Sequence, residues 1–117
     1  MIRKSYVTVT GIKYYEMGKN ISVGDTVIFL KDVKNNYDDE AIAVFSHDKE
    51  KIGYVANSTR TVARGTFSAG RLYDKFDYYT VGAIRFILKD EAIVEVFYKE
   101  NPFTMPYDLQ IKATDFK

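Results

Sequence analysis

The chain has 117 residues with one histidine and no cysteine, and its 17 Lys and Arg nearly balance its 16 Asp and Glu. This length predicts a single domain over 1–117, and the cysteine and histidine counts exclude disulfides and leave too few ligands for a structural zinc site. A formal charge of +1 argues against coating nucleic acid by charge alone, and the lack of a long apolar run predicts a soluble, cytoplasmic protein.

Four strands are predicted in the first half of the chain. Residues 5–12 alternate with period two and are rich in β-branched side chains, which is typical of a half-buried strand. Residues 26–31 contain a continuous apolar run, and residues 40–46 and 51–55 add two further short strands.

The loop between the second and third of these strands is rich in Asn and Asp and carries Tyr37 at its middle. Asn and Asp favour turns because their side chains bond the local backbone and tolerate left-handed geometry. A large aromatic residue is unusual there, so its ring is either folded onto the core or held out for a partner. Composition alone favours the inward position, because most aromatic residues belong to cores.

A single helix is predicted after the fourth strand. Asn57 or Ser58 can cap its first turn by accepting a free backbone N–H, and Gly70 is suited to end it in a left-handed conformation. Gly65 inside this segment disfavours the helix by about 1 kcal/mol relative to alanine. Residues 72–77 then follow as a linker.

The last third of the chain is predicted to add a hairpin and an edge strand. Residues 78–88 and 91–98 alternate with period two on either side of a short polar turn. Prolines on both sides of Phe103 keep that segment out of a sheet, and residues 107–114 are expected to form the edge strand. The order of elements predicts a mainly β fold, a small barrel of about six to seven strands with one helix inserted after the fourth.

The sequence lacks the motifs of common catalytic sites. It has neither a glycine-rich phosphate loop nor a nucleophile elbow, and its lone histidine, His47, lies in a polar turn. The adjacent carboxylates Asp38 and Asp39 are more typical of turn caps than of an acid–base pair, and no other residue completes a catalytic set. We therefore expect a protein that is not an enzyme and that uses no cofactor and no metal ion.

Aromatic residues beside polar ones stand out at the ends of the predicted strands. These groups are Lys13-Tyr14-Tyr15, Asn35 with Tyr37-Asp38, Tyr54, and Phe103. In a small barrel such ends can converge on one face. Stacked aromatic side chains with a few cations and amides hold single-stranded nucleic acid, at about 1–3 kcal/mol per stacked base. The same aromatics also suit an apolar patch for a protein partner or a second copy of the chain.

At these residues the sequence resembles a HIRAN domain. The similarity covers most of the chain and is carried by Thr10-Gly11-Ile12-Lys13-Tyr14-Tyr15, Asn35-Asn36-Tyr37-Asp38-Asp39-Glu40-Ala41-Ile42-Ala43-Val44, Ile52-Gly53-Tyr54-Val55 and Phe103-Thr104-Met105-Pro106. The resemblance implies an OB-like barrel that captures the 3′-hydroxyl end of single-stranded DNA. In eukaryotes this domain is fused to fork-remodelling translocases of the helicase-like transcription factor type. Short free-standing versions occur in bacteria, and this chain looks like one of those.

The resemblance also implies a set of DNA-binding residues, namely Lys13, Tyr14, Tyr15, Asn35, Tyr37, Asp38, Tyr54, Asn57 and Phe103. Tyr14 and Tyr37 would stack on the terminal bases. Asp38 would accept a hydrogen bond from the terminal 3′-hydroxyl, with Asn35 helping to fix the end. Lys13 stands where the family has Arg and would meet a phosphate, Tyr15 would shape the pocket, and Phe103 would contact a base.

Three positions depart from the pattern of the eukaryotic domain. Tyr54 stands where that domain has a phosphate-contacting His, Asn57 falls near a Lys, and Asn36 replaces a Pro. The first two changes remove positive charge, and arginines in and beside the predicted helix are candidates to replace it. The implied partners are DNA 3′ ends and a helicase, translocase or nuclease acting in DNA repair or at replication forks, with no membrane.

Overall fold

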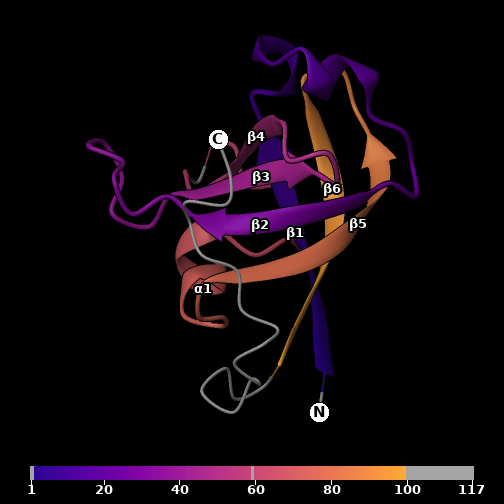
Figure 1. Ribbon diagram of the computed structural model, residues 1–117. Coiled ribbons are helices and arrows are strands. Elements are labelled where there is room, and N and C mark those ends of the chain that lie inside the picture. Colours follow the sequence, from indigo (N-terminus) through magenta and orange to yellow (C-terminus); the bar gives the residue numbers. More distant parts are fainter. Residues whose placement is uncertain (1, 59, 100–117) are drawn as a thin grey trace.

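The computed structural model describes residues 2–58 and 60–99. Its strands in these ranges are β1 (Ile2–Thr10), β2 (Thr26–Lys31), β3 (Ile42–Ser46), β4 (Lys51–Val55), β5 (Tyr79–Ile87) and β6 (Glu91–Lys99). Its helices are the short 3₁₀-helices η1 (Ile12–Tyr14) and η2 (Met17–Asn20) and the α-helix α1 (Ala69–Tyr73). The predicted mainly β class is confirmed (Figure 1).

The strands close into an antiparallel barrel in the order β1-β4-β3-β2-β5-β6. β1 closes the barrel because it pairs along its whole length with β6 and also, through Val9↔Val55 and Thr10↔Tyr54, with β4. The predicted small barrel with a helix after the fourth strand is therefore confirmed.

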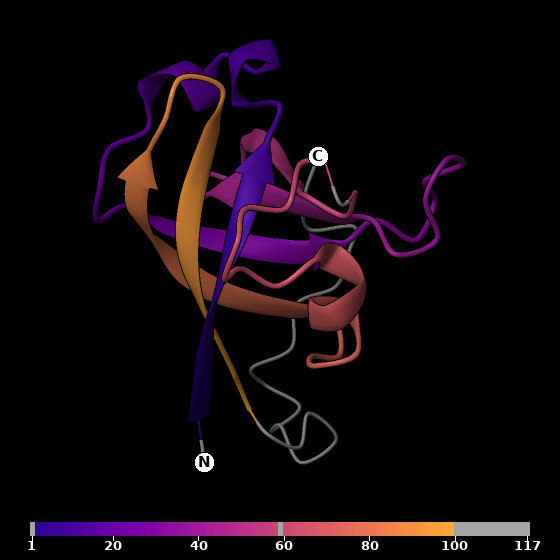
Figure 2. The same ribbon diagram turned by 180° about the vertical axis from the view of Figure 1, so that it is seen from behind.

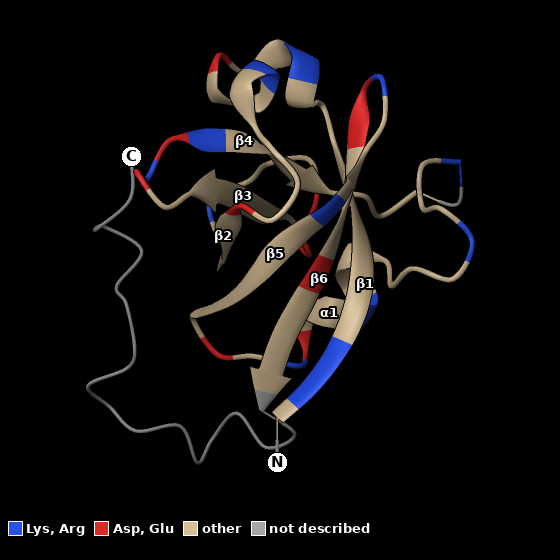
Figure 3. Ribbon diagram, turned by 90° about the vertical axis from the view of Figure 1, so that its right-hand side faces the viewer, with Lys and Arg blue, Asp and Glu red and all other residues tan. Residues whose placement is uncertain are grey.

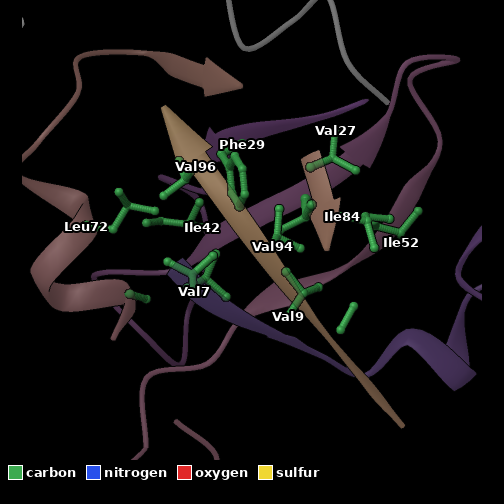
Figure 4. Close-up of a cluster of buried hydrophobic side chains, with 14 of the residues drawn as sticks. Val7, Val9, Val27, Phe29, Ile42, Ile52, Leu72, Ile84, Val94 and Val96 are labelled. Carbon is green, nitrogen blue, oxygen red and sulfur yellow. The ribbon is translucent and has the colours of Figure 1, made fainter. Parts of the chain in front are cut away.

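The barrel interior is filled by apolar side chains from alternate strand positions (Figure 4). Val7, Val9, Phe29, Ile84 and Val94 are all fully buried there. Burying a side chain of this size stabilises the fold by about 1.5–3 kcal/mol relative to leaving it exposed. In β1 and β6, the period-two alternation that predicts the strand thus also selects the core.

The outward-facing positions of β2 and β3 carry a second, smaller apolar cluster. Leu30, Ala43 and Phe45 form it, and Tyr54 and Tyr79 pack against it. Because neighbouring strand residues point to opposite faces, this cluster lies on the outside of the barrel while Phe29 and Val44 lie inside. The Tyr54 ring is therefore fixed on the outer surface of the sheet.

The helix predicted over 57–70 is wrong in its position. Residues 57–58 and 60–68 form turns, bends and irregular structure, and α1 starts only at Ala69, so that it overlaps the predicted linker. Ser68 caps α1, since its Oγ accepts a hydrogen bond from the Arg71 N–H at 3.2 Å. Leu72 belongs to the barrel core. Local capping residues at 57 and 58 could not outweigh the partners that β1 offers to the backbone of this segment.

The remaining differences concern the boundaries of predicted elements. The first strand, predicted over 5–12, spans Ile2–Thr10. It ends at Thr10 because Gly11 has a left-handed φ of 77° and turns the chain into η1. Phe103 and the predicted strand 107–114 lie outside the described residues. No helix in the described part of the chain has the length and apolar character that crossing a membrane requires.

Candidate nucleic-acid interface

The loop between β2 and β3 is held in shape by its own Asn and Asp side chains. Asn35 Oδ1 accepts hydrogen bonds from the backbone N–H groups of Tyr37 and Asp38, at 2.8 and 3.0 Å. Asp38 Oδ1 accepts in turn from the N–H of Glu40 at 2.9 Å. These are the local bonds through which Asn and Asp stabilise turns.

Tyr37 points away from the barrel. Its side chain is 98% exposed, so the inward position favoured by composition is wrong. In Figure 1 the β2–β3 loop projects beyond the strands that it joins, at the left of the view. The polar groups around Asn35 form hydrogen bonds within the loop. The Tyr37 ring therefore presents a flat apolar surface to solvent.

Asp38 connects this loop to the segment between β4 and α1. Its Oδ2 accepts a hydrogen bond from Asn57 Nδ2 at 3.3 Å, and Asn57 Oδ1 accepts from the Gly70 N–H at 2.9 Å. An ionised carboxylate offers about four acceptor sites, so the half-buried Asp38 retains acceptor capacity beyond these bonds. Asn57 thus holds the carboxylate in place with an amide.

Tyr54 is tied to the base of the same loop. Its hydroxyl donates to Asp32 Oδ2 at 2.7 Å and accepts from Lys51 Nζ at 2.9 Å, while Asn35 Nδ2 donates to the same Asp32 oxygen at 3.4 Å. Burial, followed by the hydrogen bond to Asp32, raises the pKa of Tyr54 to about 12. The phenol therefore stays protonated, as the donor to Asp32, into the alkaline range, and it supports the loop.

The ammonium group of Lys51 lies near the rings of both Tyr15 and Tyr54. Its Nζ lies 6.0 Å from the centroid of the Tyr15 ring and 4.8 Å from that of the Tyr54 ring. Attraction between an ammonium group and aromatic faces at such distances is worth about 0.5–1 kcal/mol at exposed sites. A continuous chain of contacts, Tyr15–Lys51–Tyr54–Asp32–Asn35, thus runs across the outer surface of the barrel.

Sequence reasoning missed both Asp32 and Lys51 as members of this chain of contacts. Lys51 and Tyr54 are three residues apart, so strict alternation would place them on opposite faces of a strand. The pairing of β3 with β4 shifts register between Val44 and Phe45, and this irregularity brings both side chains to the outer face. Asp32 lies three residues before Asn35, at the start of an Asx-rich loop. That position was the sequence signal that Asp32 could bond within the loop.

Lys13 and Tyr14 lie on η1, at the top of Figure 1. Tyr14 is 77% exposed. Lys13 Nζ lies 5.3 Å from the centroid of the Tyr14 ring and 3.6 Å from Asp90 Oδ2 in the turn between β5 and β6. In the described ranges, no hydrogen bond, ion pair or cation–π contact joins either residue directly to the β2–β3 loop.

The predicted site residues therefore form three groups on the structure. Asn35, Tyr37 and Asp38 share one loop, to which Asn57 is bonded. Tyr54 and Tyr15 are joined to that loop through Asp32 and Lys51, and Lys13 and Tyr14 lie next to Tyr15 on η1. Phe103 lies outside the residues that the structure describes.

Across residues 2–58 and 60–99, no three His, Cys, Asp or Glu side chains gather in a way that could hold a metal ion. His47 is well exposed in the β3–β4 turn, 3.4 Å from Asp48 Oδ1. What the arrangement offers is exposed aromatic faces beside a positioned carboxylate and a few cations.

Comparisons with known proteins identify the family and the fold of the chain. Residues 2–72 match the family model of the HIRAN domain, a span that contains every predicted site residue except Phe103. A crystal structure of a protein from Lactobacillus plantarum is similar with a TM-score of 0.54 and 22% identity, covering 85% of this chain and all of that one. At that identity the likeness concerns the fold alone. No curated protein matches the chain significantly.

Proposed function

This chain belongs to the HIRAN domain family of nucleic-acid-binding modules, and we propose that it is a non-catalytic module that captures the 3′-hydroxyl end of single-stranded DNA. A partner helicase, translocase or nuclease would use such a module to locate strand ends in repair or at replication forks.

The observation that carries the proposal is the pairing of Asp38 with Tyr37. The fully exposed Tyr37 ring offers a stacking surface, and the adjacent residue is a carboxylate held in place by Asn57. A carboxylate accepts a hydrogen bond from a free hydroxyl but repels a phosphate. A site built to bind a hydroxyl can therefore reject a strand end that lacks one by several powers of ten.

The other residues have supporting roles in the proposal. Tyr14 supplies a second exposed stacking surface, and each stacked base contributes about 1–3 kcal/mol. Lys13 supplies a cation beside Tyr14 for a phosphate oxygen. Tyr54 and Asn57 position the loop and its carboxylate, as their hydrogen bonds to Asp32 and Asp38 indicate.

Substitution of Asp38 tests the proposal. We expect Asp38→Ala to weaken binding of an oligonucleotide with a free 3′-hydroxyl by about tenfold, because a hydrogen bond to a charged group is worth roughly 1.5–3 kcal/mol and this one is partly solvated. Asp39→Ala is the matched control, since Asp39 is the exposed neighbour with the same charge. Fluorescence anisotropy measures both affinities. Equal losses for the two variants would contradict the role of Asp38.

The exposure of the same tyrosines supports a second candidate function. Tyr14 and Tyr37 are 77% and 98% exposed, as expected for a patch that binds a protein partner or a second copy of this chain. Light scattering during size-exclusion chromatography distinguishes the two functions. A dimer that Tyr37→Ala dissociates, with no oligonucleotide binding, would favour assembly over DNA capture.

A further inference from the structure

Charge is segregated between the two segments that meet at Asp38. Residues 32–40, the β2–β3 loop, contain four acidic residues and one lysine, a net charge of −3. Residues 56–73, which we call the arginine strap, contain three arginines, Arg60, Arg64 and Arg71, and no Asp or Glu, a net charge of +3. The chain as a whole carries only +1, so this separation is local.

The arginine strap is fixed to β1. The hydroxyl of the fully buried Thr8 accepts a hydrogen bond from the Ala63 N–H at 3.1 Å and lies 3.0 Å from the Thr66 hydroxyl. The Phe67 N–H donates to the Tyr6 carbonyl at 2.7 Å. Because these partners belong to a barrel strand, the strap has a defined path over the surface.

Tight turns hold Arg60 and Arg64 out into solvent. Arg60 lies in a turn closed by a bond of 2.9 Å from the Val62 N–H to the Ser58 carbonyl. Arg64 lies in a turn closed by the Thr66 N–H and the Ala63 carbonyl at 3.0 Å, with Gly65 at a φ of 87°. Figure 3 shows blue positions, which mark Lys and Arg, along this connection.

In the described ranges, none of Arg60, Arg64 and Arg71 forms an ion pair. The Arg71 guanidinium lies 3.9 Å from the centroid of the Phe67 ring, which orients it without neutralising its charge. Unpaired guanidinium groups that a fold holds in fixed places are suited to phosphate.

The arginine strap begins and ends beside the candidate end-binding carboxylate. Asn57, near its start, bonds Asp38, and the same Asn57 side chain accepts from Gly70, the residue before Arg71. In Figure 2 the β2–β3 loop and α1 lie at the right of the barrel, and the strap crosses the near face to reach α1. A strand whose end lies at Asp38 therefore has a basic surface directly next to it.

We propose that the arginine strap binds the phosphodiester backbone of the captured strand, on the 5′ side of its terminal nucleotides. The inference rests on the proposed capture of a 3′-hydroxyl end and adds the path and orientation of the strand. The acidic loop repels phosphates and admits only the uncharged hydroxyl end, whereas the strap attracts the phosphates that follow. Opposite charges on adjoining segments thus fix the direction in which the strand lies.

The test varies oligonucleotide length and salt. The variant is Arg60→Gln/Arg64→Gln, which leaves Arg71 and its contact with Phe67 intact. Lys4→Gln/Lys75→Gln is the control, because it removes the same charge outside the strap. Anisotropy titrations use a 4-nucleotide and a 12-nucleotide single-stranded DNA, each with a 3′-hydroxyl or a 3′-phosphate, from 50 to 200 mM salt.

We expect the arginine variant to lose affinity for the 12-nucleotide strand and to bind the 4-nucleotide strand as the unmodified protein does. Its plot of log affinity against log salt should be less steep by about 1.4, since each phosphate contact in single-stranded DNA contributes about 0.7. An unchanged slope, or an equal loss for both lengths and for the lysine control, would overturn the strap proposal. The preference for a 3′-hydroxyl over a 3′-phosphate reports separately on end capture, so the two proposals fail by different readouts.

Discussion

Tyr54 stands where the resemblance implies a phosphate-contacting histidine, and in this structure it supports a loop. Its hydroxyl joins Lys51 to Asp32, and Asp32 also accepts from Asn35 at the base of the Tyr37 loop. A histidine here would offer a cation to a phosphate, whereas the phenol with its raised pKa remains neutral and supports the loop. Under the proposed function, the positive charge that this position lacks is supplied by the arginine strap.

The pH dependence of stability should report on Tyr54. Because its pKa in the folded state is raised from 10.0 to about 12, the folded protein keeps the phenol protonated where the unfolded chain ionises it. This contribution is fully present below pH 10 and is lost as the pH rises through about 12. We expect the stability difference between the unmodified protein and Tyr54→Phe to shrink over that range in urea unfolding. A difference that stays constant from pH 9 to 12 would contradict the assignment.

The exposed position of Tyr37 could not be predicted from its residue type. Most aromatic residues are buried, yet this one is held outside by the hydrogen bonds of Asn35 to the loop backbone. Those bonds were predictable from the Asx-rich sequence, but the direction of the ring depends on the three-dimensional path of the loop. The motif that resembles the HIRAN domain carried that information where composition did not.

At the scale of elements, the strands were predictable and the helix was not. Period-two alternation and short apolar runs are local properties, and together they identified all six strands of the barrel to within a few residues. The segment 57–68 contains good helix caps, but its backbone finds partners on β1, in the Thr8 hydroxyl and the Tyr6 carbonyl. These partners are distant in sequence, so no local sequence pattern predicts them. The irregular β3–β4 pairing, which brings Lys51 and Tyr54 to the same face, could not be predicted from the sequence for the same reason.

Thr8 is the element-scale anchor of the arginine strap, and its substitution should show this. Thr8→Val keeps the shape of the side chain but leaves the Ala63 N–H without its acceptor, which costs about 1–3 kcal/mol for a buried donor. Thr10→Val is the control, because the Thr10 hydroxyl makes only a long bond of 3.4 Å to the Tyr54 carbonyl. Urea unfolding compares the two. If Thr8→Val were no more destabilising than Thr10→Val, the strap would not depend on this anchor.

At the scale of the whole molecule, the barrel is a rigid support for two loops of opposite charge. The Asn57 side chain joins the strap to the β2–β3 loop by hydrogen bonds to Asp38 and Glu40, although the two segments are separated in sequence by β3 and β4. A net charge of +1 argues against bulk attraction to nucleic acid, but it conceals the local separation of −3 from +3. The whole-chain charge says little about a protein that is proposed to recognise one end of a strand.

The most direct test of that proposal compares strand ends on the unmodified protein. Anisotropy titrations should use one oligonucleotide sequence with a free 3′-hydroxyl, with a 3′-phosphate, and with a 5′-phosphate in addition to a free 3′-hydroxyl. We expect the 3′-phosphate to weaken binding by about tenfold or more, because Asp38 repels it, and the 5′-phosphate to leave the affinity unchanged. Equal affinity for the free and the blocked 3′ end would contradict end capture.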